Sequence, residues 1–294
     1  MANLKELRNR IGSVKNTRKI TLAMSQIATA RLRKAQEAVL AAKPYGDRMR
    51  EVIDSLVSGI DEAERAAAHP LLATRPVKRE LLLVMTADRG LCGGFNTNIN
   101  RAALNWIRQR GREGVQVEVI AIGKKAVASL KAAKIPLRKT YDAPTLATLV
   151  ATSKMVIADA IAAFDSPVTG ERVDAVRLFF NEFVSVLTQK VKNEVVLPLV
   201  PGESTGRGRE PTYEPSREAI LAHLVALAVE ARLQQAMFNS IAAEIAARRV
   251  AMDAATDNAT DMIADLTLTY NRERQAAITK ELMEIIGGAE ALKG

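Results

Sequence analysis

The sequence has few of the residues on which metalloenzymes and disulfide-bonded proteins depend. It contains one cysteine, Cys92, and two histidines, His69 and His223, among 294 residues. A single cysteine excludes an internal disulfide, and its spacing from the histidines fits no zinc motif. Aromatic residues make up only 4% of the chain. This is expected where alanine-rich helices replace a thick core.

Long apolar runs and nucleotide-binding motifs are also missing. The apolar run Leu81 to Met85 is far too short to cross a bilayer. A phosphate-binding loop needs GxxxxGK followed by Ser or Thr, but GESTGRGR has the wrong spacing and no lysine, and GLCGG lacks the dinucleotide spacing. The sequence therefore predicts no catalytic residue, no bound cofactor and no metal. The basic N-terminus resembles a transit peptide, but an apolar helical pattern begins at Leu4, so we expect none.

Glycine and proline are absent from Ser216 to Ile286. At about 1.5 Å per residue, this stretch predicts a helix of about 100 Å. Apolar or small residues recur there in steps of three and four, which is the pattern of a coiled-coil seam with Gln234 and Arg248 inside it. The expected seam residues are Ile220, Leu224, Leu227, Ala231, Phe238, Ile241, Ile245, Met252, Ala255, Ala259, Met262 and Leu266.

The other end of the chain offers a partner for this helix. Good helix formers fill Asn3 to Lys43, and a further apolar stripe predicts that the helix resumes or bends after Pro44 and Gly46. We expect an antiparallel pair whose repeat slips by one residue near Thr17. The expected seam residues of the first helix are Leu4, Leu7, Ile11 and Val14, and then Ile20, Met24 and Ile27.

The last helix is longer than its partner, so part of it must lie beyond that partner. Its end is apolar, and an uncovered apolar tip predicts an external protein sleeve. The apolar residues expected inside that sleeve are Ile278, Leu282, Ile285, Ile286 and Leu292.

The net charge of +9 is concentrated in the first helix. Up to Lys34 this helix contains nine lysines and arginines but only one acidic residue, Glu6. Such a run is usually a solvated face, and the alternatives are an acidic protein partner or nucleic acid. No aromatic residue interleaves the basic helix for base stacking, which argues against nucleic acid. A basic nucleic-acid-binding coiled coil is thus the alternative function, and a nucleotide-dependent enzyme built on the middle segment is a third.

The middle of the chain alternates strands with helices, which predicts a mostly parallel, Rossmann-like sheet covered by helices. Residues 183–198 alternate like a hairpin or edge strand with Lys192 and Asn193 at its turn. The expected strands are 80–86, 115–122 and 175–181, and the expected helices are 96–110, 124–133 and 145–164.

The loop DRGLCGG, which follows the first strand, holds the remaining candidates for chemistry. Cys92 would need a nearby base to act as a nucleophile. The alternative is that it is simply a small residue in a tight turn, which requires no base. Asp88 and Arg89 could form a catalytic pair, but an ion pair that braces the loop is the simpler interpretation. We therefore expect an α/β fold with a long antiparallel α-helical coiled coil. Its parts are 1–60 (first helix), 78–200 (globular domain) and 212–294 (last helix).

Three segments carry a resemblance to a known family. They are LRNRIGSVKNTRKITLAMSQIATARLRKAQ, DRGLCGGFNTNI and YNRERQAAITKELMEIIGGAEAL. Together they resemble the gamma subunit of the F-type ATP synthase, the central shaft of the rotary enzyme. The last segment is the most specific, because the Ile-Thr pair, Glu281, Glu284 and Gly288-Ala289 all keep the family's spacing.

The resemblance implies a central-stalk rotor with no catalytic group of its own. It would turn inside a ring of three alpha and three beta subunits and contact the epsilon subunit and the membrane c-ring. Met24 matches the position that meets the acidic lever of a beta subunit, and Arg274 and Gln275 match the pair that engages a beta loop. Arg248 matches a shaft arginine near the same zone.

Two departures leave the ionic contacts beside Met24 open, because Leu22 and Ser25 stand where relatives often carry lysine and glutamate. For Arg248 the alternative is a solvent-facing seam residue. The lack of an inserted cysteine pair and of a convincing transit peptide favours a bacterial protein on the cytoplasmic face of the plasma membrane.

Overall fold

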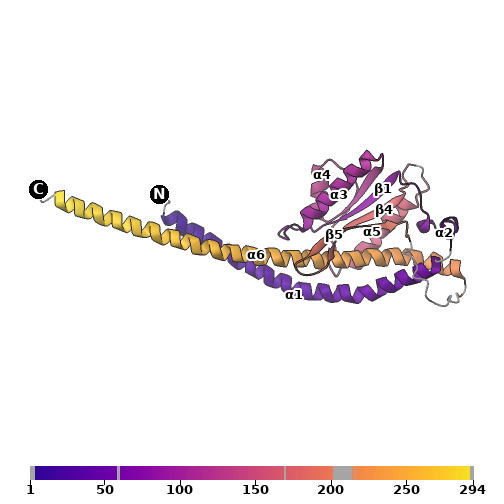
Figure 1. Cartoon of the computed structure of the whole chain (residues 1–294), viewed down its shortest axis with the longest axis horizontal. Helices are drawn as coiled ribbons and strands as arrows, with labels where there is room; N and C mark the ends of the chain where they lie inside the picture. The colour runs from indigo at the N-terminus through magenta and orange to yellow at the C-terminus, as the bar shows by residue number, and fades with distance from the viewer. Residues whose placement is uncertain (1–3, 58–59, 169, 201–213, 215, 292–294) are drawn as a thin grey trace. The chain divides into compact units, whose positions relative to one another are not determined.

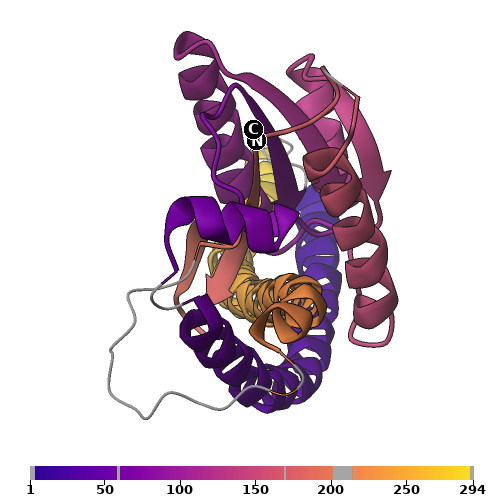
Figure 2. The same ribbon diagram turned by 90° about the vertical axis from the view of Figure 1, so that its right-hand side faces the viewer.

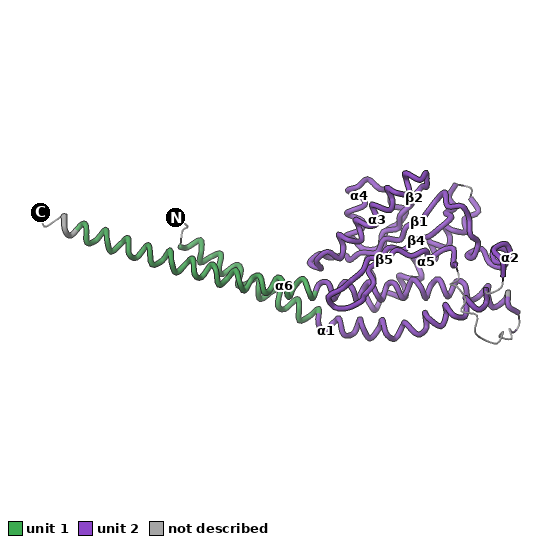
Figure 3. The backbone as a smooth tube through the Cα atoms, in the orientation of Figure 1, with its two compact units in different colours: residues 1–28, 249–294 green, residues 29–248 purple. Residues whose placement is uncertain are grey.

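The computed structural model describes residues 4–57, 60–168, 170–200, 214 and 216–291. The chain divides into two compact units (Figure 3): residues 1–28 with 249–294 form a helical unit, and residues 29–248 form an α/β unit. Two long helices, α1 (Leu4–Val57) and α6 (Arg217–Ala291), run through both. The remaining elements lie in the α/β unit. They are α2 (Glu62–Ala68), η1 (Pro70–Leu72), β1 (Arg79–Met85), α3 (Phe95–Arg112), β2 (Gln116–Ile122), α4 (Lys124–Ala132), β3 (Leu137–Tyr141), α5 (Leu149–Phe164), β4 (Ala175–Phe183) and β5 (Gln189–Leu197).

The α/β unit is built on a five-stranded sheet in the order β3-β2-β1-β4-β5 (Figure 1). Strand β1 pairs in parallel with β2 and with β4, β2 pairs in parallel with β3, and β5 pairs antiparallel to β4. The central strand β1 has a parallel neighbour on each side, and its residues 80–85 are all buried. This burial explains its nearly continuous apolar sequence.

Each face of the sheet is covered by a different set of helices (Figure 2). Leu82 and Val84 point to one face, where they pack with α3 and α4. Leu81 and Leu83 point to the other face, where the core includes α5, the end of α1 and α6. Side chains alternate along a strand, so β1 supplies both cores. The large residues that α6 contributes there are spaced by four: Leu221, Val225, Val229, Leu233 and Met237.

In the helical unit, α1 and α6 lie side by side and antiparallel. The hydroxyl of Thr256 donates to that of Thr21 at 2.7 Å, and the hydroxyl of Ser25 donates to the carboxylate of Asp253. These bonds tie an early residue of one helix to a later residue of the other. The predicted pairing of the terminal helices is therefore confirmed.

The predicted seam of the first helix is partly wrong. Leu7, Thr21, Ser25 and Ala28 are buried, and Ile11 and Val14 are half-buried. This heptad spacing continues past Thr17 without the expected slip. Small polar residues occupy two of its positions, and the apolar residues Ile20 and Ile27 are 60% and 54% exposed instead. The apolar pattern therefore assigned the wrong face of this part of α1 to the seam.

The seam of the last helix also differs from the prediction in places. Leu227 and Met262 are exposed. The side chain of Gln234 donates to the hydroxyl of Ser153 on α5, and Arg248 donates to the carbonyl of Gly90. Both residues thus face the α/β unit's own core or loops, because α6 is buried there on more than one side.

The strands and helices of the middle segment were predicted with errors at the sheet edges. The sequence reading missed β3, whose residues are half-buried or exposed, and also missed α2 and η1. The β4–β5 connection lies at 184–188, whereas Lys192 and Asn193 pair with Phe180 and Phe179 within the ladder. The predicted turn is therefore wrong, and the edge strand is right. Helix α1 continues through Pro44.

A buried charge network joins the start of β1 to its neighbours. The Glu80 side chain is 1% exposed and accepts hydrogen bonds from Arg110 (3.0 Å), Arg177 (2.9 Å) and the indole of Trp106 (2.9 Å). The guanidinium of Arg177 also lies 4.3 Å from the Trp106 ring centre. The carboxylate therefore compensates the charges of two guanidinium groups that are themselves mostly buried.

We predict that Glu80→Gln lowers the unfolding free energy of the α/β unit by about 3 kcal/mol, because it leaves partly buried cations uncompensated. Glu113→Gln is the matched control: Glu113 pairs with the same Arg110, but its side chain is 42% exposed, so its loss should cost under about 1 kcal/mol. Trp106 is the only tryptophan, so urea unfolding followed by its emission reports this unit. Equal losses in the two variants would contradict the prediction.

Candidate functional site

The C-terminal part of α6 presents an exposed apolar stripe. Ile278, Leu282, Ile285 and Ile286 are 49%, 54%, 67% and 56% exposed. At about 100° per residue they lie within about 100° of the helix circumference, so they form one face. The sequence predicted these residues as an uncovered tip, and the structure leaves them uncovered within the part of the chain that it describes. Leu292, which was predicted with them, lies outside the described residues.

The stripe lies on a different side of α6 from the helix pair. Leu4 of α1 lies beside Glu273, Ala277 and Lys280 in a shallow groove. By helical geometry the three α6 residues are centred about 160° from the apolar stripe. Two of the groove's charged residues, Lys280 and Glu284, form an ion pair at 3.6 Å. The stripe is therefore a second apolar face of α6 and not a continuation of the seam.

Helix α1 has an exposed apolar patch of its own. Ile20, Met24 and Ile27 have the spacing of one helix face, and Met24 is half-buried between its two exposed neighbours. Sequence reasoning singled out Met24 but placed all three in the seam. Their exposure, together with the buried Thr21 and Ser25 beside them, shows that this patch faces away from α6.

Ser25 is one of the departures that left the contacts near Met24 open. Its hydroxyl is buried and donates to Asp253, and the neighbouring Thr21–Thr256 bond lies one turn away. Polar pairs within a coiled coil fix the register of its helices. Ser25 therefore acts within the helix pair.

The other predicted contact residues differ in exposure. Arg274 and Gln275 are exposed on α6 and lie within about 60° of Ile278 around the helix. Arg248 is different, because its side chain is 19% exposed and its guanidinium pairs with Glu244 and with the carbonyl of Gly90. It is neither solvent-facing nor in the seam. The role of all these residues in contacting a partner remains a prediction.

The DRGLCGG loop between β1 and α3 is braced by hydrogen bonds. Asp88 accepts from the backbone amides of Lys124 (2.9 Å) and Ala143 (3.1 Å). It thus braces the loop as expected, but through amides and not through Arg89. The side chain of Asn96 accepts from the amide of Ala87 at 2.9 Å and donates to the carbonyl of Arg89 at 3.3 Å.

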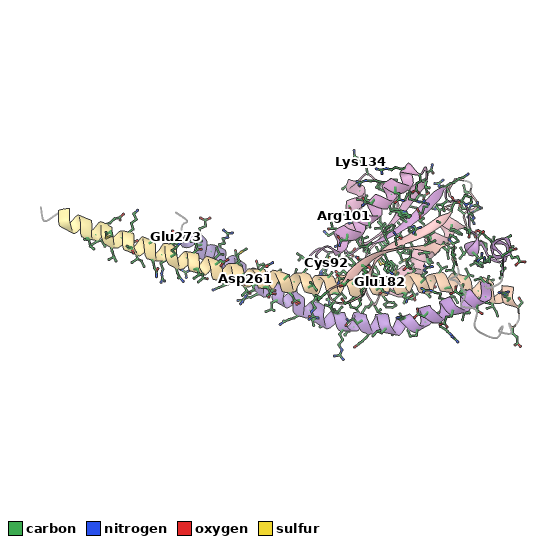
Figure 4. The ribbon with its side chains drawn as sticks, in the orientation of Figure 1. Cys92, Arg101, Lys134, Glu182, Asp261 and Glu273 are labelled. Atoms are coloured by element: carbon green, nitrogen blue, oxygen red, sulfur yellow. The ribbon has the colours of Figure 1, made fainter. Side chains whose placement is uncertain are left out.

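Cys92, labelled in Figure 4, belongs to this loop. Its side chain is buried, and its sulfur accepts a hydrogen bond from Asn96 at 3.1 Å. Burial first, and the nearby Glu244 second, raise the pKa of the Cys92 thiol. Thiolate is therefore scarce near neutral pH, which opposes a nucleophilic role.

The described residues contain no group of three or more His, Cys, Asp or Glu side chains that could hold a metal ion. A groove of about 310 Å³ in the α/β unit is lined by α1, α6 and the end of β5, including Met49, Arg50 and Arg232. Among the described helices, none is long and apolar enough to span a membrane.

Comparison with known proteins agrees with this architecture. The family model described as ATP synthase matches residues 3–292. The ATP synthase gamma chains of Geobacter sp. (strain M21) and Anaeromyxobacter sp. (strain K) are each 42% identical to this chain, over 296 and 300 residues, and each alignment covers 100% of both chains. The chain belongs to the ATP synthase gamma chain family. Members of this family are non-catalytic subunits of their complex.

Solved structures of distant relatives share the fold. A chain of the Euglena gracilis mitochondrial ATP synthase, solved with its OSCP, F1 and c-ring, is 20% identical, with a TM-score of 0.65 over 98% of this chain and 94% of that one. A chain from the central stalk and c-ring of the Tetrahymena thermophila enzyme has a TM-score of 0.56 at 20% identity, over 80% of this chain and 99% of that one. The helix pair with an inserted sheet is thus the gamma-chain fold.

We predict an energetic coupling of about 0.5–1 kcal/mol between Thr21 and Thr256, as for a typical net hydrogen bond. A double-mutant cycle of Thr21→Val and Thr256→Val should show it in the amide hydrogen exchange of residues 18–28 and 250–260. Thr260→Val is the control partner, because the Thr260 hydroxyl donates to a carbonyl of its own helix. A cycle between Thr21 and Thr260 should give none, and equal values in the two cycles would refute the register bond.

Proposed function

We propose that this chain is the central-stalk rotor of a bacterial proton-translocating ATP synthase. It couples rotation of the membrane c-ring to conformational change at the catalytic sites of the alpha/beta ring. Full-length gamma-chain relatives support this role, as does the fold shared with the Tetrahymena central stalk. The complex would lie at the cytoplasmic face of the plasma membrane.

The apolar stripe of α6 is the observation that carries this proposal. An exposed apolar face on a helix that already has a seam requires a second partner, since water does not favour it. A collar formed by the inner surface of the alpha/beta ring would cover Ile278, Leu282, Ile285 and Ile286. The neighbouring Arg274 and Gln275 would then reach a loop of one beta subunit.

A rotor can act on catalytic sites without supplying a reactive group. Three sites of identical sequence differ only when something asymmetric contacts them differently. In the helical unit, the exposed apolar residues are unevenly placed: Ile20, Met24 and Ile27 form a patch on α1, and the stripe lies on the C-terminal part of α6. A tenfold difference in nucleotide affinity needs about 1.4 kcal/mol, which a few such contacts provide if they bias a two-state hinge.

The remaining contacts complete the proposed assembly. Met24 would meet the acidic lever of a beta subunit, and Arg248 would lie near that zone. The α/β unit would bind the epsilon subunit and the c-ring. The basic face of α1 provides a positive potential that suits an acidic partner surface.

Co-expression with the alpha and beta subunits of the same bacterium tests the proposal directly. We expect one copy of this chain for three alpha and three beta subunits, and an ATPase activity that depends on its presence. Failure to recover a stoichiometric, active complex would refute the role. Single-particle imaging of the product would show whether α6 enters the ring.

A pair of substitutions tests the stripe itself. We predict that Leu282→Asp weakens binding to the alpha/beta ring by roughly 10- to 100-fold, as expected for losing about 1.5–3 kcal/mol of apolar burial. Met283→Asp is the matched control, because Met283 is 65% exposed but lies about 100° away around the helix. Titration of the ring with labelled chain measures both, and equal effects would show that the stripe has no special role.

A further inference from the structure

Arg248 and Glu244 form a mostly buried pair on α6. Glu244 lies one turn before Arg248, and a carboxylate oxygen of Glu244 contacts Nη1 of Arg248. The two side chains are only 16% and 19% exposed. Nη2 of Arg248 donates to the carbonyl of Gly90 at 3.1 Å. The guanidinium thus connects α6 to the middle of the DRGLCGG loop.

This loop has a backbone conformation that needs support. Leu91 has φ 63° and is 63% exposed, and Gly93 has φ 56°. A left-handed conformation is unfavourable for leucine by about 1–2 kcal/mol, and its side chain gains little burial in return. The bonds of Asp88 and Asn96 hold the loop to the rest of the α/β unit. The bond from Arg248 holds its middle to α6.

The face of α6 beneath the loop carries small side chains, which permit close contact. Cys92 and Phe95 pack with Ala243 and Ala247 of α6 in one small apolar cluster. These alanines are buried at 0% and 8% exposure, and their small side chains let the loop approach the helix backbone. Glu244 and Arg248 directly follow the two alanines in sequence, so they lie next to this contact face.

We propose that the Glu244–Arg248 pair is a latch that holds the loop 88–94 on α6. The latch acts within the α/β unit, where it fixes the loop to the part of α6 that belongs to this unit. Arg248 is then a positioning residue within the chain, whose guanidinium is occupied by its own loop. The latch itself does not depend on the proposed rotor function.

Cys92 provides a native reporter for the latch. It is the only cysteine, it is 1% exposed, and it lies in the loop that the latch holds. Alkylation of the full-length chain by N-ethylmaleimide under native conditions therefore measures loop opening. We expect Arg248→Met to raise the alkylation rate at least tenfold, and Arg248→Lys to raise it less, because lysine retains the charge beside Glu244 but not the forked donors.

Arg249→Met is the matched control. Arg249 is the next residue, and its side chain is 37% exposed and lies 3.7 Å from Asp253. We expect the alkylation rate of Cys92 in Arg249→Met to stay within twofold of the rate in the unmodified chain. A rate for Arg248→Met within that same range would overturn the latch.

Hydrogen exchange separates loop release from general unfolding. In Arg248→Met we expect faster exchange of the amides of 89–94, with the amides of β1 unchanged. Equal loss of protection in the loop and in β1 would also overturn the proposal, because it would show a general loss of stability. In an assembled complex, we further expect Arg248→Met to reduce ATP-driven proton pumping more than ATP hydrolysis. Failure of the unmodified chain to assemble with the alpha and beta subunits would contradict the rotor function and leave the thiol result standing.

Discussion

The packing of α6 is the constraint on which the rest of this structure depends. The helix has 75 residues and must satisfy different neighbours along its length. In the α/β unit, large apolar residues such as Val225 and Leu233 are fully buried beside the sheet. In the helical unit the buried positions include Leu7 and Met252, but several are small or polar, as at Thr21, Ser25 and Ala28 of α1. Apolar burial there is modest, so directional hydrogen bonds specify the register instead.

In two separate places a buried carboxylate is paired with arginine side chains. Glu80 is compensated by Arg110 and Arg177 at the start of the sheet, and Glu244 is compensated by Arg248 on α6. Burial raises the pKa of Glu244, and the adjacent Arg248 opposes that shift. A buried carboxylate without its partner is costly. Each network therefore favours a single arrangement of the segments it joins.

The sequence was informative where burial and local propensity agree. Strands β1, β2 and β4 were predicted because their runs are apolar on both faces, and α6 because nothing interrupts it. Strand β3 was missed since Leu137–Tyr141 is a largely exposed edge. The seam of α1 was misplaced because its buried Thr21 and Ser25 are polar while the exposed Ile20 and Ile27 are apolar. No hydrophobic pattern could have corrected that.

At the candidate site, too, some features could be predicted from the sequence and others could not. The stripe from Ile278 to Ile286 could be predicted, because exposure at a helix end follows from the unequal lengths of α1 and α6. The Arg248–Gly90 bond could not, since its partners are far apart in the sequence and neither residue type requires the other. The family resemblance placed Arg248 near a partner, whereas the fold gives its guanidinium a partner within the chain.

These features together limit how a rotor of this kind could signal to its surroundings. The exposed apolar faces of α1 and α6 are both carried by continuous α-helices. A helical face changes little in shape when it meets a new surface, so a difference in contact energy would appear in the partner. Ring subunits with two accessible conformations would respond to whichever face they meet. The asymmetry of this helix pair would then be sufficient to make equivalent sites unequal.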